Sequence, residues 1–223
     1  MMFPSVVKIH ATQQDPDYDA PWQSSTPSSG TGSGLVLEDG TILTAAHVVA
    51  NATFLQVQKA SGAARQIARV SSVCHDADLA LLELDEPSYV EGIPTLPFGE
   101  LPHLRDKVLV CGFPIGGSEL SITEGVVSRV EVQQYTHSQR HLLAITVDAA
   151  INSGNSGGPV IRDGKIIGVA FQSMEHAENI GEVIPVPLIE HFLEASRRGI
   201  STSIPGWGLS LQNLENAALR KHL

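Results

Sequence analysis

Cysteine is scarce in this sequence, whose 223 residues contain two, Cys74 and Cys111. Two are too few for a scaffold stapled by disulfides, and we expect both to be free thiols in separate halves of the fold. No run of about 18 apolar residues occurs, so no transmembrane helix is expected. The first residues lack the basic stretch and the apolar stretch of a secretory signal peptide, so none is predicted within this sequence.

Basic residues are also few, with 14 Lys and Arg against 24 Asp and Glu and a net charge of −10. This charge argues against nucleic acid or an anionic membrane as the main partner. The hydrophobic content of 42% allows a sizeable core, and 17% charged residues is low for a disordered chain. The length fits one large domain or two small ones.

Short apolar segments separated by turn residues dominate residues 5–185 and predict an all-β sandwich or barrel. Hairpin turns are expected at residues 39–40 and 162–165. The proline-rich residues 87–102 are interpreted as a connection between two halves. One helix is expected at residues 188–198, because apolar side chains recur there at helical spacing and a glycine follows.

Three other segments contain residue types that occur in functional sites. Residues 30–34 are glycine-rich but lack the spacing of a dinucleotide-binding motif, and a strand is expected after them. His137 and His141 are four apart, but no glutamate accompanies them and the region reads as strand, so a metal site is not expected. Residues 12–29 are expected to form an exposed loop, in which Tyr18 and Trp22 would anchor the loop or a subunit contact.

The segment 152–159, Asn-Ser-Gly-Asn-Ser-Gly-Gly-Pro, is too small and glycine-rich to pack a core. A serine flanked by glycines, as Ser156 is, can hold its hydroxyl out on a sharp turn beside uncovered backbone N–H groups. An acyl-transfer enzyme needs such N–H groups to bind the oxyanion of a tetrahedral intermediate. The alternative is an ordinary surface turn, since Gly, Asn, Ser and Pro all favour turns.

Two upstream residues could activate a serine. His47 could take the proton of the hydroxyl, although a histidine among small and apolar residues is more often a satisfied core side chain. Asp78 stands at the mouth of an apolar run, where a carboxylate is costly unless it is paired. Asp76 is the rival and would otherwise lie in a solvated turn. His47, Asp78 and Ser156 therefore form a candidate triad in the chain order His–Asp–Ser.

These segments resemble the motifs of the HtrA/Deg family of serine proteases. Residues 44–47 resemble its histidine motif, 78–82 its aspartate motif and 154–159 its serine motif, and residues 148–152 and 178–185 match as well. The resemblance covers nearly the whole chain and is strongest to the plant-type Deg branch and its bacterial relatives. It implies an all-β fold of two six-stranded antiparallel β-barrels of the chymotrypsin type, with a C-terminal helix and the triad between the barrels.

The resemblance also implies a division of the chain. The expected parts are a protease domain at 1–199, with barrel one at about 5–98, barrel two at about 106–187 and a helix at about 188–198, and the start of a PDZ domain at 200–223. The PDZ segment is too short to form such a domain here. Ser153 departs from the proline common in the wider family, although the plant-type branch shares the serine.

By the same resemblance, the oxyanion hole would lie in the turn Gly154, Asn155 and Ser156, with Gly154 and Ser156 donating backbone N–H groups. Ala150 would form the base of the pocket for the residue that precedes the cut, and Val183 would add an apolar wall. A small neutral base offers no carboxylate to a basic side chain, so cleavage is expected after Val, Ala, Ile or similar residues.

The expected function is an ATP-independent serine endopeptidase that cleaves unfolded or damaged proteins, with no cofactor and no metal. The alternative is a protease-like peptide-binding or chaperone module that does not cut. The expected partners are unfolded polypeptides and further copies of the chain in a homo-oligomer, a trimer or a multiple of it, with no nucleic acid and no membrane span. The expected location is periplasmic or otherwise extracytoplasmic if the source is bacterial, and the alternative is cytoplasmic or plastid.

Overall fold

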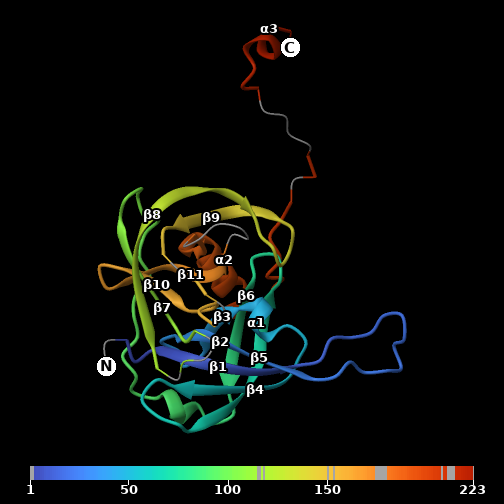
Figure 1. The fold of residues 1–223 in the computed structure, drawn as a ribbon, viewed down its shortest axis with the longest axis vertical. Helices are drawn as coiled ribbons and strands as arrows, with labels where there is room; N and C mark the ends of the chain where they lie inside the picture. Colours follow the sequence, from blue (N-terminus) through green and yellow to red (C-terminus); the bar gives the residue numbers. More distant parts are fainter. Residues whose placement is uncertain are drawn as a thin grey trace.

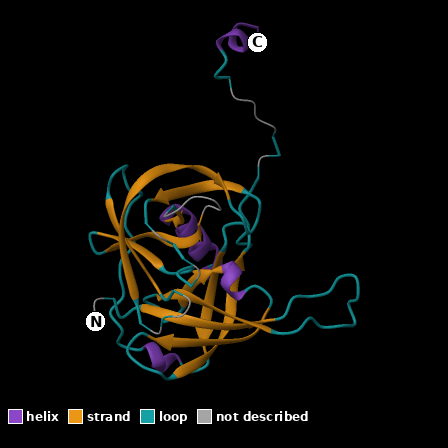
Figure 2. Cartoon of the chain, in the orientation of Figure 1, coloured by secondary structure: helices purple, strands orange, loops and turns teal. Residues whose placement is uncertain are grey.

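The chain folds into two closed antiparallel β-barrels, each of six strands, as the family resemblance implies (Figures 1 and 2). The structure is a computed structural model that describes residues 3–114, 117, 119–149, 151–152, 154–173, 180–206, 208–209 and 214–222, the side chains of residues 172 and 173 excepted. In Figure 1 the two barrels lie one above the other, with the N-terminal barrel below.

Barrel one closes in the order β1-β2-β3-β6-β5-β4. Its interior is apolar because one side of each strand carries the buried Val, Ile, Leu and Ala side chains, as in Val7, Ile9 and Ala11 of β1. The strands are β1 (Val6–Gln13), β2 (Ser28–Val36), β3 (Ile42–Ala45), β4 (Ala52–Lys59), β5 (Arg65–Cys74) and β6 (Leu79–Leu84).

Barrel two closes in the order β10-β11-β12-β9-β8-β7 and has its own apolar interior. The strands are β7 (Lys107–Gly112), β8 (Ser121–Gln134), β9 (His141–Val147), β10 (Pro159–Arg162), β11 (Lys165–Ser173) and β12 (Gly181–Pro185). The strands of barrel one fall between residues 6 and 84 and those of barrel two between residues 107 and 185. The division of the chain into domains stays a prediction. The assignment of residues 200–223 to a PDZ start stays a prediction, because several of those residues lie outside the described ones.

Helices are few and short. The helix α1 (Ala46–Val49) follows β3, the 3₁₀ helix η1 (Pro87–Val90) lies in the proline-rich connection, and α3 (Ala217–His222) lies apart from both barrels (Figure 1). The predicted C-terminal helix is α2 (Val186–Arg197), which packs on β11 and β12 and is followed by Gly199 at φ +61°. Among the described helices, α2 is the longest, and none has the length and apolar character needed to cross a membrane.

A shared apolar cluster joins the barrels and places the candidate site at their boundary. Burying one large apolar side chain contributes roughly 1.5–3 kcal/mol, so a cluster of this size holds the barrels firmly together. Backbone bonds add to it, since Gly99 donates to Ile166 O at 2.7 Å and Ile166 donates to Pro97 O at 2.9 Å. The cluster includes Leu35, Leu43 and Leu79 from barrel one, Tyr135 and Phe171 from barrel two, and Ile189 and Phe192 from α2.

The glycine-rich residues 30–34 lie within β2, whereas the sequence predicts a strand only after them. Close packing explains the difference. A Cβ on Gly32 would come within 2.5 Å of Val48 Cγ1, and one on Gly34 would come within 2.8 Å of Ile42 Cγ2. Glycine therefore serves here to bring β2 against its neighbours, although glycine usually weakens a strand.

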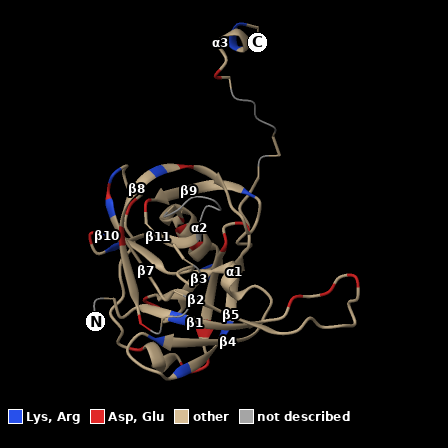
Figure 3. Cartoon of the chain, in the orientation of Figure 1, with Lys and Arg blue, Asp and Glu red and all other residues tan. Residues whose placement is uncertain are grey.

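The loop between β1 and β2 projects from barrel one, at the right of Figure 1. It carries Asp15, Asp17 and Asp19, which account for its red segments in Figure 3. Tyr18 is 87% exposed and Trp22 is 80% exposed. These aromatics therefore lie on the surface, and the subunit contact expected of them stays a prediction.

Candidate active site

His47 belongs to α1, and two hydrogen bonds to one carboxylate fix its position. Its main-chain N–H donates to Asp78 Oδ1 at 2.8 Å, and its ring Nδ1 donates to Asp78 Oδ2 at 2.7 Å. The backbone is tied in the same direction, because the N–H of Ala46 donates to the carbonyl of Asp78 at 3.0 Å. Since Nδ1 carries the proton in this pair, Nε2 is left as a proton acceptor.

Asp78 is 1% exposed and lies in the turn that leads into β6. Its φ of +55° falls in the left-handed region, which Asp adopts more readily than most residues. A buried carboxylate is tolerated when hydrogen bonds satisfy it, and His47 supplies two. Asp78, the acid that the sequence favours, contacts His47, whereas the rival Asp76 contacts other residues.

Asp76 binds two segments of the C-terminal half. Its Oδ2 accepts a hydrogen bond from Arg140 Nη1 at 3.3 Å and one from the N–H of Ile204 at 2.9 Å. Arg140 also donates to the carbonyl of Ile204 at 2.9 Å. Asp76 therefore ties the turn before Asp78 to the β8–β9 loop and to the segment that follows α2.

Gln13 supports α1 from the end of β1. Its Nε2 lies 3.3 Å from the carbonyls of His47 and Val48 and 3.1 Å from that of Ala50. The last carbonyls of a helix have no partner within the helix, so the amide satisfies them in place of water. The polar sequence around Gln13 suggested only a loop, and this role was not predicted.

Ser156 lies on the turn that precedes β10, in barrel two. Its hydroxyl donates to the carbonyl of Phe171 at 3.3 Å. Gly157 follows at φ +84°, and a Cβ on it would lie 2.2 Å from Ser33 O and from Thr44 Oγ1. The turn therefore packs closely against β2 and β3 of barrel one, and β3 is followed directly by the helix that carries His47.

Some backbone N–H groups around Ser156 donate hydrogen bonds to other described residues, and others do not. The N–H of Asn155 donates to Asn152 O at 2.9 Å, and those of Gly157 and Gly158 donate to Ala170 O at 2.7 Å and Asn155 O at 2.9 Å. The N–H groups of Gly154 and Ser156 have no hydrogen-bond partner among the described residues.

Two N–H groups are therefore available in this turn to bind an anion, whereas the N–H of Asn155 is already used. Asn155 is 3% exposed, and its side-chain Oδ1 accepts no hydrogen bond from any described residue.

A histidine pair lies beside His47. His75 Nδ1 and His137 Nε2 share a hydrogen bond at 2.8 Å, and the ring centroid of His137 is 6.3 Å from that of His47. Burial lowers the pKa of His137; Asp78 acts in the opposite direction, and His75 and His47 lower it further. Within the described ranges, no group of three or more His, Cys, Asp or Glu side chains is arranged to hold a metal ion.

Of the two residues expected to line the substrate pocket, the structure describes only Val183. Ala150 lies outside the described residues. Val183 is in β12, pairs with Ala170 and Ile145, and is fully buried in the interior of barrel two. In this structure its side chain offers no exposed surface.

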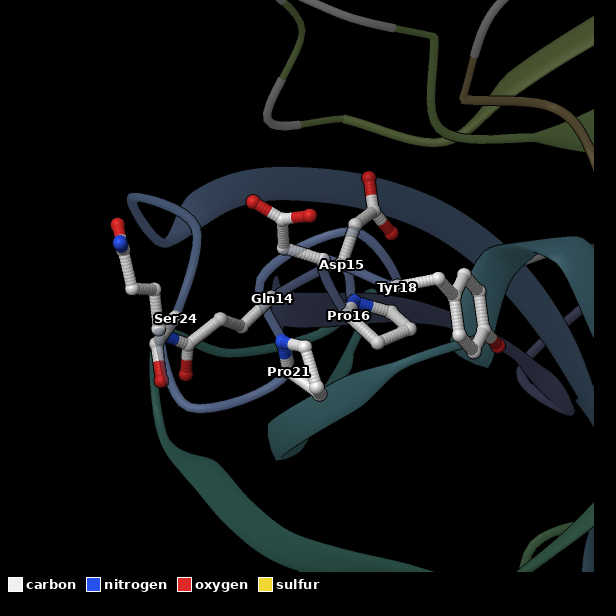
Figure 4. A pocket seen from close by; sticks show the side chains of 8 residues that line it. Gln14, Asp15, Pro16, Tyr18, Pro21 and Ser24 are labelled. Atoms are coloured by element: carbon white, nitrogen blue, oxygen red, sulfur yellow. The ribbon is translucent and has the colours of Figure 1, made fainter.

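A separate hollow of about 300 Å³ lies in the projecting β1–β2 loop (Figure 4). Residues 14–24 of that loop alone form it. The loop keeps its shape through its own bonds, because Asp17 Oδ1 accepts the N–H groups of Asp19 and Ala20, both at 3.0 Å. None of the candidate site residues lines this hollow, so it is distinct from the site around His47.

Comparison with known proteins agrees with this geometry. A family profile described as a trypsin-like peptidase domain matches residues 32–169, which include His47, Asp78 and Ser156. The profile therefore covers more than half of the chain and parts of both barrels, and it leaves out β1 and β12.

Two curated plant proteins are similar over almost the whole chain. The putative protease Do-like 3, mitochondrial, of Arabidopsis thaliana is 45% identical over 218 residues, which is 97% of this chain and 39% of that protein. The protease Do-like 2, chloroplastic, of the same plant is 45% identical over 223 residues, 98% of this chain and 37% of that protein. The chain thus spans about two fifths of the length of these relatives.

Among solved structures, the HtrA-type protease AlgW with tripeptide superposes with a TM-score of 0.78 at 26% identity. The match covers 98% of this chain and 68% of that one. The arrangement of two barrels is therefore shared with an HtrA-type protease.

Proposed function

The chain belongs to the trypsin-like peptidase family and to its HtrA/Deg branch, and we propose that it is an ATP-independent serine endopeptidase acting on unfolded or damaged polypeptides. The observation that carries the proposal is the pair of hydrogen bonds from His47 to the buried carboxylate of Asp78. This pair orients the imidazole and leaves Nε2 free to accept a proton at the boundary of the barrels.

Ser156 is the nucleophile in this proposal. Its hydroxyl, which donates to Phe171 O, rotates about the Cα–Cβ bond toward His47 Nε2 when a substrate binds; catalytic hydrogen bonds are often long or misaligned in free enzymes. Ser156 Oγ then attacks the peptide carbonyl while His47 takes the hydroxyl proton. His47 passes that proton to the leaving amine, and an acyl-enzyme remains. Water, deprotonated by the same histidine, releases the acid and restores Ser156.

The oxyanion of each tetrahedral intermediate binds to the backbone N–H groups of Gly154 and Ser156. Both are unengaged by described residues, and both lie on the nucleophile turn. Preorganised donors at the position where negative charge develops are usually the largest single contribution to acyl-transfer catalysis. Asn155 belongs to the same turn but contributes its position rather than its N–H.

Specificity follows from Ala150, which we place at the base of the pocket for the residue that precedes the cut, with Val183 backing that pocket from the barrel interior. A small, neutral base gives no counter-charge to a basic side chain, so cleavage after Val, Ala or Ile is expected. Mass spectrometry of casein fragments tests this, and a dominance of cuts after Lys or Arg would overturn it.

We further propose that the chain assembles as a homo-oligomer, a trimer or a multiple of it, and takes unfolded polypeptides as substrates. The names of the plant relatives refer to mitochondria and chloroplasts, which is compatible with the plastid or cytoplasmic alternative for its location. The periplasmic assignment and the PDZ start at 200–223 stay predictions.

Hydrolysis of unfolded casein by the wild-type chain and by Ser156→Ala tests the function. The wild type should degrade casein without ATP, and the variant should lose several orders of magnitude in kcat with an unchanged unfolding transition. Casein that binds to the wild type without being cut would instead support the alternative of a peptide-binding module.

A further inference from the structure

Ser33 of β2 is buried, and hydrogen bonds engage all of its polar groups. Its hydroxyl donates to the carbonyl of Gly154 at 2.7 Å and accepts the N–H of Phe113 at 2.8 Å. Its own N–H donates to the carbonyl of Ser156 at 2.8 Å, and its carbonyl accepts Thr44 Oγ1 at 2.7 Å. One residue of barrel one thus binds the nucleophile turn on both sides of Asn155.

We propose that Ser33 is a positioning residue for the oxyanion-binding turn, acting from the opposite barrel. This inference rests on the proposed function, because it assigns Ser33 to the same reaction. Ser33 does not touch the reacting atoms. It acts by holding the peptide that joins Gly154 to Asn155 in one orientation.

That peptide is held at both of its polar groups. Its carbonyl, on Gly154, accepts the Ser33 hydroxyl, and its N–H, on Asn155, donates to Asn152 O at 2.9 Å. A peptide plane fixed at both ends cannot rotate without breaking both bonds. The orientation matters because the N–H groups proposed to bind the oxyanion belong to the peptides on either side.

The backbone at Gly154 would not keep this conformation by itself. Its φ is +101°, and glycine passes easily between such values and others because it has no Cβ. The hydroxyl of Ser33 therefore selects one conformation among several that the turn could adopt. The main-chain bond from Ser33 to Ser156 survives any substitution at Ser33 except proline, so the effect of the hydroxyl can be isolated.

The hydroxyl also brings in the end of β7, because Phe113 donates to it. Packing there is tight: a Cβ on Gly112 would lie 2.9 Å from Ser33 Oγ and 2.9 Å from Asn155 Cα. The same hydroxyl thus connects three segments, namely β2, the turn at Gly154 and the start of the loop after Gly112. A shift of that loop would reach the oxyanion-binding turn through this contact.

Kinetics of Ser33→Ala test the proposal, with Val57→Ala as the matched control. Val57 is fully buried in the core of barrel one and belongs to a different apolar cluster, so its truncation lowers stability without touching the turn. For each protein we would measure kcat and KM on a peptide substrate, the urea midpoint of unfolding, and the affinity for a peptide boronate that mimics the tetrahedral intermediate.

Ser33→Ala should lower kcat by about 10- to 100-fold with KM changed by less than about threefold, because disordering the oxyanion donors weakens binding of the transition state and not of the substrate. Boronate affinity should fall by a similar factor. Val57→Ala should keep kcat and boronate affinity within about twofold at a comparable loss in urea midpoint. Should Ser33→Ala fail to fold, Ser33→Cys provides a weaker donor of similar shape and should lower kcat at least about fivefold.

A kcat and boronate affinity of Ser33→Ala within twofold of the wild type, or a loss matched by Val57→Ala, would overturn the assignment. The proposed function fails differently, since in that case the wild type itself would not cut the peptide.

Discussion

Asp78 accepts two hydrogen bonds from one residue, the main-chain N–H and the ring Nδ1 of His47, at 2.8 and 2.7 Å. Each of its oxygens has one of these bonds, so the carboxylate fixes the ring and the backbone of α1 together. In this arrangement a single buried acid sets the tautomer, the direction and the position of the proposed base.

Asp78→Asn should lower kcat/KM by about 10³- to 10⁴-fold with little change in KM. The Asn amide has only one acceptor oxygen, so it cannot accept both hydrogen bonds from His47, and the imidazole loses the required tautomer. Steady-state hydrolysis of a peptide substrate measures this. Asp76→Asn is the matched control, since Asp76 contacts Arg140 and Ile204 instead. It should keep activity within about threefold and lose about 1 kcal/mol of stability at most. Equal losses in the two variants would contradict the assignment of the acid.

The side-chain amide of Gln13 should stabilise α1, although Gln13 lies in a stretch that the sequence predicts as a loop. Gln13→Glu removes the N–H groups that face the carbonyls of His47, Val48 and Ala50 and puts a negative charge there. The free energy of unfolding should fall by about 1–3 kcal/mol, and kcat should fall with it. Gln14→Glu makes the same chemical change one residue later, where the amide donates only to Ser25 O of the loop. It should leave kcat unchanged, and similar kcat losses in both variants would show that the capping contact is unimportant.

His137 should make the protein less stable in mild acid. Burial lowers its pKa in the folded state, so the unfolded chain binds the proton more tightly. The stability that neutral His137 contributes to the folded state is therefore fully present above the pKa of histidine in the unfolded chain, about 6.5. It is lost as the pH falls below that pKa. Urea unfolding at pH 7.5 and 5.5 should show a smaller loss for His137→Gln than for the wild type. Since His10, whose pKa is also lowered by burial, is present in both proteins, its effect cancels. Identical losses would refute this prediction.

Both cysteines are free in the structure, as the sequence predicts, and both are buried. Burial raises the pKa of Cys111 to about 12 and also raises that of Cys74, so neither forms a thiolate readily near neutral pH. Ellman's reagent should therefore react slowly with the native protein. After unfolding in guanidinium without a reductant, it should detect two thiols per chain. Finding none would mean that the two are joined.

Turn chemistry made much of the fold predictable. Glycine follows aspartate at residues 39–40 and 163–164, and Gly40 and Gly164 both adopt the positive φ that such hairpins need. The pairing of His47 with Asp78 was also accessible, because an acid that enters a buried strand requires a partner. The fold within each barrel follows from these local patterns and from the family resemblance.

Contacts between distant segments could not be read from local patterns. Ser33 and Gly154 are 121 positions apart, and the glycines around Ser33 suggested irregular structure rather than a packed strand. Gln13 lies in a polar stretch that resembles a loop, yet its amide supports the helix of His47. β8 includes Gly125, a residue type of low strand propensity, because residues 121–126 pair with β7. In each case tertiary packing determined the outcome.

The most direct test of the proposed mechanism is covalent labelling with a fluorophosphonate, followed by mass spectrometry of the digested protein. The hydroxyl of an activated serine displaces fluoride from phosphorus, whereas an ordinary serine does not react. The proposed mechanism predicts one adduct per chain, on the peptide that contains Ser156, and no adduct in Ser156→Ala or His47→Ala. An unlabelled wild type, or an adduct on a different residue that persists in Ser156→Ala, would contradict it.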